Sequence, residues 1–517
     1  MEFARSAGVL CHVTSLPGEY GIGDLGAGAH AFVDFLQAAG QSYWQVLPLG
    51  PTSDGSPYVA ESSWAGSPWL LSLDALRAAG DLDDGDLSAA RRGPARHVDF
   101  EWLARTRPAL LRLAATRFFE HARDDARAAF DAFCIASTTW LEDWALFTSA
   151  KARFGGAPWW AWPEGLALRD PGAMARAKEE WGDELRAARY VQFRFHEQWR
   201  ALRDHAARAG VRFIGDVPIY CAGDSADVWA TRHVFELDGA GRPTHVSGVP
   251  PDYFATDGQL WGTPLYDWRA CEAEGFSWWC ARLRAALAQT DVVRIDHFRA
   301  FESYWSVPAH AATAREGRWV EGPGDTFFAA IAAELGSAPF IAEDLGIITP
   351  RVRALRDRWE LPGMRVLQFG FGDDAINPHL PPYHVRASVA YTGTHDNNTT
   401  AGWFAAATEN ERDLFRRYTA SSGEFCHYHM MRACFASVAA LAIVPMQDVL
   451  GQGAESRMNT PGQAAGNWTY RLLAQDLDSA AVAMLRSVTQ DFGRLPEQES
   501  ARVQRDEEEV RAHATAG

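Results

Sequence analysis

The run VVRIDH, Val292–His297, is short, apolar at its start and polar at its end. Seven further runs of the same kind occur along the 517-residue chain. They are Gly8–Val13, Tyr43–Pro48, Arg212–Val217, Phe340–Leu345, Arg365–Gly370, Ser388–Gly393 and Leu441–Gln447. Each is short enough for one strand and has the buried character of a parallel strand. Helically patterned stretches such as Ala29–Ala39 and Thr349–Trp359 lie between them. Eight such units predict an α/β fold, a (β/α)8 TIM barrel.

Two long segments interrupt this alternation. Residues 57–198, after the second run, are rich in Ala, Arg and Trp and predict a mainly helical insertion. Residues 233–268, after the third run, are rich in Pro, Gly and aromatic residues. Long connections after barrel strands usually shape a substrate cleft, so we expect the second segment to cover the active site. The predicted organisation is a catalytic barrel over residues 1–493, interrupted by both segments, and a charged C-terminal tail over residues 494–517.

Composition limits the classes of partner. Hydrophobic residues make up 47% of the chain and charged residues 22%, as in ordinary folded proteins. The net charge of −17 disfavours nucleic acid and anionic membranes, which attract basic surfaces. We find no signal-peptide core, no apolar run of membrane-spanning length and no paired CxxC among seven cysteines. These features predict a cytoplasmic protein, and the excess of arginine over lysine is typical of a high-GC bacterial genome.

Acidic residues recur where the predicted strands end. Asp216 ends IGD, Asp296 ends VRID, Glu343 ends IAE, and Asp396 follows YTGTH. Catalytic groups of TIM barrels lie at the carboxyl ends of the strands. Because residues two apart in a strand point the same way, Arg294 should lie beside Asp296 and keep its carboxylate ionised. Glu343 follows the apolar run FIA, so we expect burial to raise its pKa towards that of a general acid.

Two carboxyl groups in unequal environments are what glycosidic chemistry requires, since one attacks the anomeric carbon and the other exchanges protons. Each acid alone could equally be a structural ion pair or a solvated strand end, and we expect the second of these for Asp344. Several acids at successive strand ends favour catalysis. His297 fits packing or function equally, and His12 is interpreted as a buried structural histidine.

Three motifs carry a family resemblance. They are VRIDHFR (Val293–Arg299), IAEDLG (Ile341–Gly346) and THDNNTT (Thr394–Thr400). They resemble the catalytic signatures of the 4-α-glucanotransferases, also called amylomaltases or disproportionating enzymes, of the α-amylase clan. The likeness covers nearly the whole chain. It extends through Thr14–Gly26, Ile214–Tyr220, Gly248–Trp268 and Gln447–Arg471.

The resemblance implies roles for individual residues. Asp296 would be the nucleophile, Glu343 the acid/base, and Asp396 the residue that binds sugar hydroxyls and stabilises the transition state. Further residues would bind the substrate or orient the nucleophile. They are Arg294, His395, Tyr58, Asp216, Trp261, Tyr253 and Asn467. No cofactor is implied. Where the family commonly has glutamine or asparagine, this chain has Val59, Ser67 and Thr263, which should alter affinity on the donor side.

The implied reaction is retaining transfer of an α-1,4-glucan segment from a maltooligosaccharide or starch donor to the 4-hydroxyl of another glucan or of glucose. Two alternatives stay open: an α-1,4-glucan hydrolase of the same clan, and a non-catalytic glucan-binding protein. A binding protein would not need three acids at strand ends. The expected partners are α-1,4-glucans, not nucleic acid or membrane, and the sequence predicts no oligomeric state.

One acidic stretch partly resembles a metal-binding loop. Asp81–Asp86, DLDDGD, begins like a calcium loop, but its glycine falls one position early and no glutamate stands at position twelve. We therefore predict a turn with helix-capping aspartates. No HExxH, paired CxxC or GxxxxGK motif occurs, so no metal site is predicted.

Overall fold

The computed structural model describes residues 3–251, 256–372, 376–463 and 465–497. Eight parallel strands form a closed barrel, which confirms the predicted fold. The strands are β1 (Ser6–Leu10), β2 (Tyr43–Gln45), β3 (Arg212–Val217), β6 (Val292–Ile295), β9 (Phe340–Ala342), β10 (Gly363–Val366), β11 (Ser388–Tyr391) and β12 (Leu441–Pro445). Each barrel strand pairs with the barrel strands that come before and after it in the chain, and β12 pairs with β1 to close the barrel. One prediction is shifted: the run Arg365–Gly370 begins as β10 but continues as a 3-10 helix over Leu367–Gly370.

Gly8 shows how tightly the barrel interior is packed at β1. A β-carbon at Gly8 would lie 2.5 Å from the carbonyl oxygen of Tyr43 and 2.8 Å from Cδ1 of Ile443. Those residues belong to the two strands that flank β1. Only glycine fits here, because real β-carbons do not approach backbone oxygen so closely.

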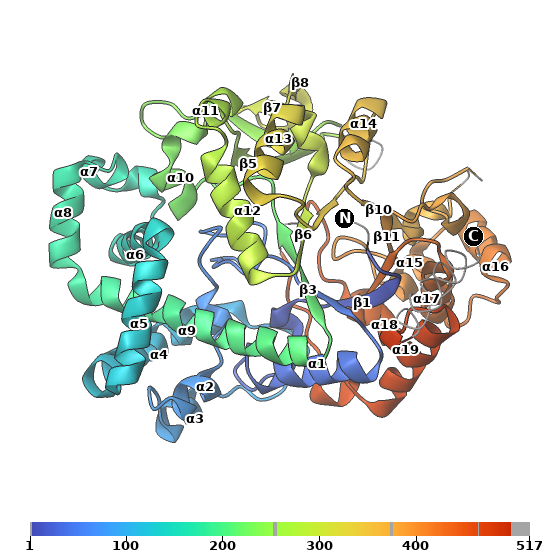
Figure 1. The fold of residues 1–517 in the computed structure, drawn as a ribbon, viewed down its shortest axis with the longest axis horizontal. Helices are drawn as coiled ribbons and strands as arrows, with labels where there is room; N and C mark the ends of the chain where they lie inside the picture. Colours follow the sequence, from blue (N-terminus) through green and yellow to red (C-terminus); the bar gives the residue numbers. More distant parts are fainter. Residues whose placement is uncertain (1–2, 252–255, 373–375, 464, 498–517) are drawn as a thin grey trace, which may run out of the picture.

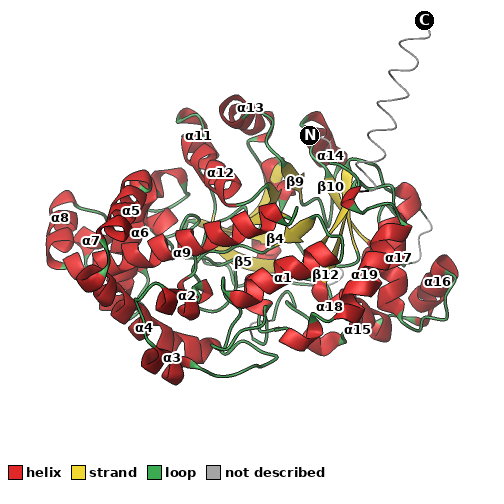
Figure 2. Ribbon diagram, turned by 60° about the horizontal axis from the view of Figure 1, so that its bottom comes forward, coloured by secondary structure: helices red, strands yellow, loops and turns green. Residues whose placement is uncertain are grey.

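Helices surround the barrel (Figures 1 and 2). Those outside the large insertion are α1 (Ala27–Ala38), α10 (Ala226–Ala230), α11 (Trp268–Ala273), α12 (Ser277–Gln289), α13 (Gly324–Leu335), α14 (Pro350–Arg358), α15 (Thr400–Ala406), α16 (Glu409–Thr419), α17 (Cys426–Ala436), α18 (Met446–Val449) and α19 (Ser479–Asp491). Helix α14 begins at Pro350 with Thr349 as its N-cap, as the sequence indicated. Of the predicted tail, residues 498–517 lie outside the described residues.

The connection between β2 and β3 is mainly helical. Its helices are α2 (Leu73–Ala78), α3 (Asp84–Ala90), α4 (Phe100–His121), α5 (Asp124–Ala136), α6 (Thr138–Arg153), α7 (Glu164–Ala167), α8 (Pro171–Glu180) and α9 (Gly182–Arg208). Figure 1 shows α4 to α8 gathered on the left, away from the barrel strands, with α9 leading back. Asp83 caps α3 through a capping box, so the DLDDGD stretch is a turn and helix start as predicted.

A second sheet is antiparallel, in the order β5-β4-β7-β8. The excursion after β3 supplies β4 (His245–Val249) and β5 (Gln259–Pro264). The connection after β6 supplies β7 (Ser303–Pro308) and β8 (Arg318–Glu321), which the sequence analysis did not predict. Strand β4 pairs with β7, far away in the chain, and neither strand has a clear alternating pattern of its own. The sheet places β5 beside the loop after β6, which carries Asp296 and His297.

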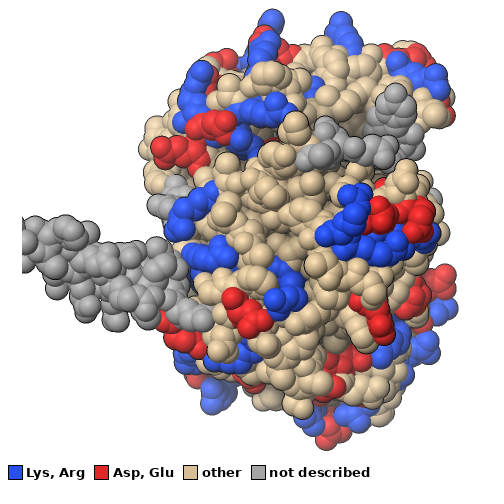
Figure 3. All heavy atoms as spheres, turned by 90° about the vertical axis from the view of Figure 1, so that its right-hand side faces the viewer, with Lys and Arg blue, Asp and Glu red and all other residues tan. Residues whose placement is uncertain are grey.

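The surface carries both signs of charge. On the face drawn in Figure 3, acidic and basic side chains are interspersed among uncharged ones. None of the helices in the described residues is long and apolar enough to cross a membrane.

Candidate active site

Arg294 lies at the centre of a buried ion-pair network at the carboxyl ends of β3 and β6. It pairs in register with Asp216 on the neighbouring strand. Its Nη1 donates to both carboxylate oxygens of Asp216 at 2.7 Å, and its Nη2 donates to Oδ1 of Asp296 at 2.8 Å. The side chains of Arg294 and Asp216 are 4% and 0% exposed, whereas that of Asp296 is 27% exposed. Arg294 therefore holds one oxygen of Asp296 while the carboxylate still faces the cleft.

The charge on Arg294 is secured by these partners. Burial alone would lower the pKa of the guanidinium, but the carboxylates of Asp216 and Asp296 raise it well above the ordinary value. Tyr58, in the loop after β2, donates from its hydroxyl to Oδ2 of Asp216. A permanent cation therefore lies beside Asp296 and anchors its carboxylate by an ion pair.

Glu343 follows β9 and lies directly against the Asp296 segment. Its backbone N–H donates to the carbonyl of Ile295 at 3.0 Å. Its carboxyl accepts the N–H of His297 at 2.8 Å and that of Leu345 at 2.9 Å. Burial, and then the negative charge of Asp296, raises the pKa of Glu343 to about 8. The direction agrees with the prediction from the apolar run before it, and at neutral pH the carboxyl holds a proton.

His297 has an unusual backbone. Its φ of 47° lies in the left-handed region, which is strained for a residue with a side chain. This conformation directs its N–H towards Glu343. Its ring makes an edge contact with Trp261 of β5 at a centroid distance of 4.8 Å, and Trp261 is 39% exposed. His297 thus contacts Glu343 through its N–H and Trp261 through its ring.

Asp396 lies in the loop after β11 and faces the same cleft. Nδ2 of Asn459 donates to its Oδ1 at 2.6 Å, and Nε2 of His395 lies 3.3 Å from its Oδ2. Arg457 donates to its backbone carbonyl at 2.6 Å. Burial alone would raise the pKa of Asp396, but His395 and the Asn459 hydrogen bond outweigh burial and lower it to about 2. Asp396 is therefore ionised throughout the ordinary pH range.

An aromatic wall adjoins these acids. The ring of Tyr58 stacks on His395 with centroids 5.1 Å apart and planes 18° apart. Trp468 lies 5.8 Å from Tyr58 and 6.0 Å from His395, again between ring centroids. Stacked flat faces of this kind suit the apolar faces of sugar rings.

Not every predicted residue offers a free polar group to the cleft. The amide of Asn467 accepts from the N–H of Thr460 at 2.9 Å and donates to the carbonyl of Gln463 at 2.8 Å. It therefore organises its own loop. Tyr253 lies outside the described residues.

The three departures from the family pattern have different environments. Val59 is 44% exposed next to Tyr58. The hydroxyl of Thr263 lies 2.5 Å from that of Ser247, across β5 and β4. Ser67 is buried and precedes a short 3-10 helix.

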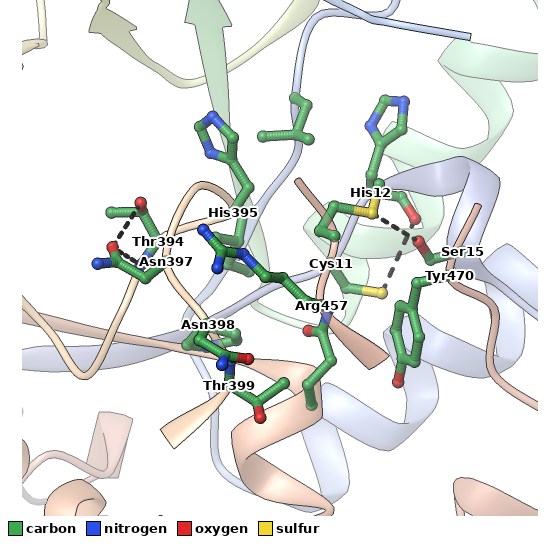
Figure 4. Close-up of a pocket in the computed structure, with 15 residues that line it drawn as sticks. Cys11, His12, Ser15, Thr394, His395, Asn397, Asn398, Thr399, Arg457 and Tyr470 are labelled. Atoms are coloured by element: carbon green, nitrogen blue, oxygen red, sulfur yellow. Dashed lines mark hydrogen bonds between the residues drawn. The ribbon is translucent and has the colours of Figure 1, made fainter. Parts of the chain in front are cut away.

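Two contacts of Asp396 were not predicted from the sequence. Asn459 and Arg457 both contact Asp396, and both lie within Gln447–Arg471, where a role was predicted only for Asn467. His12 and His395 both line a pocket beside the site, with their rings on the same side of it (Figure 4). Burial, and then the proximity of His395, keeps the pKa of His12 far below the ordinary value, at about 3, so His12 is neutral. Its Nδ1 has no hydrogen-bond partner among the described residues.

The prediction for Asp344 is wrong. Asp344 is buried, with Arg356 in an ion pair, and Oδ1 accepts the N–H of Met364 at 2.7 Å. It is a structural carboxylate and not a solvated strand end. Within the described residues, no group of three or more His, Cys, Asp or Glu side chains is placed to hold a metal ion.

Comparisons with known proteins agree with this arrangement. A family model described as 4-alpha-glucanotransferase matches residues 11–476. The 4-alpha-glucanotransferase of Thermus thermophilus is 48% identical over 507 residues, which cover 96% of this chain and 100% of that protein. The 4-alpha-glucanotransferase of a Synechocystis species is 44% identical over 95% of this chain and 98% of its own length. An amylomaltase from Streptococcus agalactiae, solved in complex with acarbose, superposes with a TM-score of 0.92 at 35% identity, covering 95% and 99% of the two chains.

Proposed function

This chain belongs to the 4-alpha-glucanotransferase family and is a glucan-transferring enzyme, and we propose that it works by a retaining double displacement centred on Asp296 and Glu343. The donor would be a maltooligosaccharide or starch chain. The acceptor would be the 4-hydroxyl of another glucan or of glucose. No cofactor takes part in the proposed reaction.

In the first step, Glu343 donates its proton to the glycosidic oxygen while the carboxylate of Asp296 attacks the anomeric carbon. The C–O bond of the donor breaks, the reducing-side segment leaves with a free 4-hydroxyl, and an ester joins the remaining segment to Asp296. The protonated state of Glu343 at neutral pH and the anchored carboxylate of Asp296 support this division of roles.

In the second step, the acceptor hydroxyl attacks the anomeric carbon of the ester and gives its proton to Glu343, while the C–O bond to Asp296 breaks and releases its carboxylate. Glu343 must be ionised by then. The structure supports such a change, because the negative charge of Asp296 is one cause of the raised pKa of Glu343. Esterification removes that charge, so the pKa of Glu343 falls and the side chain becomes a base.

Asp396 would stabilise the oxocarbenium-like transition state. Its low pKa keeps it negative as positive charge develops on the sugar ring. His395 and Tyr58 would hold the sugar on the non-reducing side of the cleaved bond, since their stacked rings adjoin Asp396. Arg294 would hold Asp296 and Asp216 in place.

Water must be kept from the ester for transfer to prevail over hydrolysis. Trp261 on β5 lies against His297, the residue after the proposed nucleophile. An aromatic side chain at this place would cover the ester and stack on an acceptor sugar. The Streptococcus agalactiae amylomaltase was solved in complex with acarbose, and we further propose that acarbose also binds to this chain, in the cleft beside Asp296.

The single observation that carries the proposal is the contact between Glu343 and the N–H next to Asp296, which sets a proton donor beside an anchored carboxylate. The test is incubation with maltotriose alone, followed by chromatography. Transfer gives glucose and a ladder of longer maltooligosaccharides with no net gain of reducing ends. Rising reducing ends with only glucose and maltose would mean that water is the acceptor. Replacing Asp296 by Asn should abolish turnover and preserve glucan binding, and retained turnover would contradict its assignment.

We also propose that the protein acts in the cytoplasm of a bacterium. All seven cysteines are free thiols, as expected in a reducing compartment. Fractionation of the source cells tests this location.

A further inference from the structure

Asp448 is a buried carboxylate outside the catalytic group. It lies in α18, directly after β12, and is 1% exposed. No lysine, arginine or histidine of the described residues forms an ion pair with it. Burial raises the pKa of its carboxyl, and the hydrogen bonds it accepts oppose that rise. An isolated buried carboxylate is costly, so its hydrogen bonds must compensate for the lost hydration.

All three of those hydrogen bonds come from the ends of one loop. We call residues 392–400 the acid loop, because it carries His395 and Asp396. At its start, the hydroxyl of Thr392 donates to Oδ2 of Asp448 at 2.5 Å. At its end, Thr400 donates its N–H to Oδ1 at 2.7 Å and its hydroxyl to Oδ2 at 2.7 Å. One side chain therefore fastens both ends of the acid loop to the end of β12.

The rest of the acid loop is held from other directions. Nε2 of Gln368 donates to the carbonyl of Asn398 at 2.9 Å. The side chain of Asn397 accepts from Thr394 within the loop, as Figure 4 shows. These contacts fix its middle, whereas Asp448 fixes the distance between its ends. The two oxygens of a carboxyl group share these three donors, whereas an asparagine would offer only one accepting oxygen.

We propose that Asp448 is a positioning residue that holds the acid loop in the shape that directs His395 and Asp396 at the glucan. It does not touch the substrate itself. This inference rests on the proposed role of Asp396. The proposed role of Asp396 does not in turn depend on Asp448.

The test is Asp448→Asn, with Asp24→Asn as the matched control. Asp24 is also a buried aspartate that accepts a backbone N–H, that of Gly26 at 2.9 Å, but it lies in the loop before α1. For each variant, kcat and KM are measured with maltotriose. Acarbose binding is measured by calorimetry well below the unfolding temperature, which gives affinity and stoichiometry separately.

We expect kcat of Asp448→Asn to fall about 100-fold, the scale of a displaced catalytic group, and acarbose affinity to weaken at full stoichiometry. Asp24→Asn should keep both. A purely structural role for Asp448 would instead lower the stoichiometry and leave the affinity of the folded fraction unchanged, which would overturn the inference. So would a wild-type kcat in Asp448→Asn.

A second set of variants follows the path through the loop. Thr400→Val removes the hydroxyl that donates a hydrogen bond to Asp448, whereas Thr400→Ser retains a hydroxyl there. Thr400→Val should lower kcat, and Thr400→Ser should keep most of the wild-type kcat. The fall in kcat caused by Asp448→Asn should be smaller in the Thr400→Val background than in the wild type. Fully additive effects would refute coupling through this hydroxyl. Asp396→Asn separates the failures: normal turnover there would refute the role of Asp396, independently of Asp448.

Discussion

The raised pKa of Glu343 gives a sharp prediction for the pH dependence of the reaction. The pKa is about 8 in place of the ordinary glutamate value of 4.5. At pH 7 about 90% of the carboxyl groups are then protonated, against roughly 0.3% at the ordinary value, so burial and Asp296 together supply roughly 300-fold more acid. Since the raised pKa favours the protonated form, acid catalysis is present at low pH and is lost as the pH rises through about 8.

The assay is kcat/KM for maltotriose across the alkaline range. This constant reports the free enzyme up to the first irreversible step, so its alkaline limb should have a midpoint near pH 8 and fall about tenfold per further pH unit. With α-maltosyl fluoride as donor the limb should disappear, because fluoride leaves without protonation. Glu343→Gln should lose about 10²- to 10⁴-fold on maltotriose and far less on the fluoride.

Either of two results would refute this reasoning. An alkaline limb of equal midpoint with both donors would mean that another group titrates. A limb for maltotriose that begins near pH 5 would mean that burial does not hold the proton on Glu343.

Three further substitutions test the network around the acids. Arg294→Met should lower the free energy of unfolding by about 3–5 kcal/mol in urea denaturation, because it leaves Asp216 buried and unpaired. Asn459→Ala should raise the pKa of Asp396, since it removes a hydrogen bond that lowers it, and the acid limb of kcat/KM should move to higher pH. Tyr58→Phe keeps the ring but removes the hydroxyl that binds Asp216, and should lower the free energy of unfolding by about 1.5–3 kcal/mol.

Each of these substitutions can be contradicted. Arg284→Met breaks a solvent-exposed pair with Glu334 and should cost less than about 1 kcal/mol, so an equal loss in Arg294→Met would deny the effect of burial. An unmoved acid limb in Asn459→Ala would mean that His395 alone sets the Asp396 pKa. Tyr20→Phe removes a hydroxyl bond to the more exposed Asp74, and a loss as large as that of Tyr58→Phe would deny any special strength to the bond within the site.

The barrel could be predicted from sequence because its information is local. A short apolar run that ends in an acid, such as the one ending at Asp296, encodes both a strand and the position of its last residue. Each of the eight strands overlaps one of the short apolar runs, although only three of these runs contain an acid at or near their end. The β7–β8 hairpin was not predicted because β7 pairs with β4, a strand far away in the chain, and the local sequence pattern does not indicate such a partner.

The groups that contact each acid in the fold determine its role more than its position in the sequence does, and these contacts cannot be predicted from the sequence. Glu343 and Asp344 are neighbours in one motif and both follow β9, but their side chains meet different partners. Asp344 meets Arg356 in an ion pair and becomes a fixed structural anion. Glu343 meets two backbone N–H groups and the negative field of Asp296 without an ion pair of its own, and becomes a proton donor. The different roles of the two acids therefore follow from the segment after β6, which lies against Glu343, and from α14 and β10, which supply the partners of Asp344.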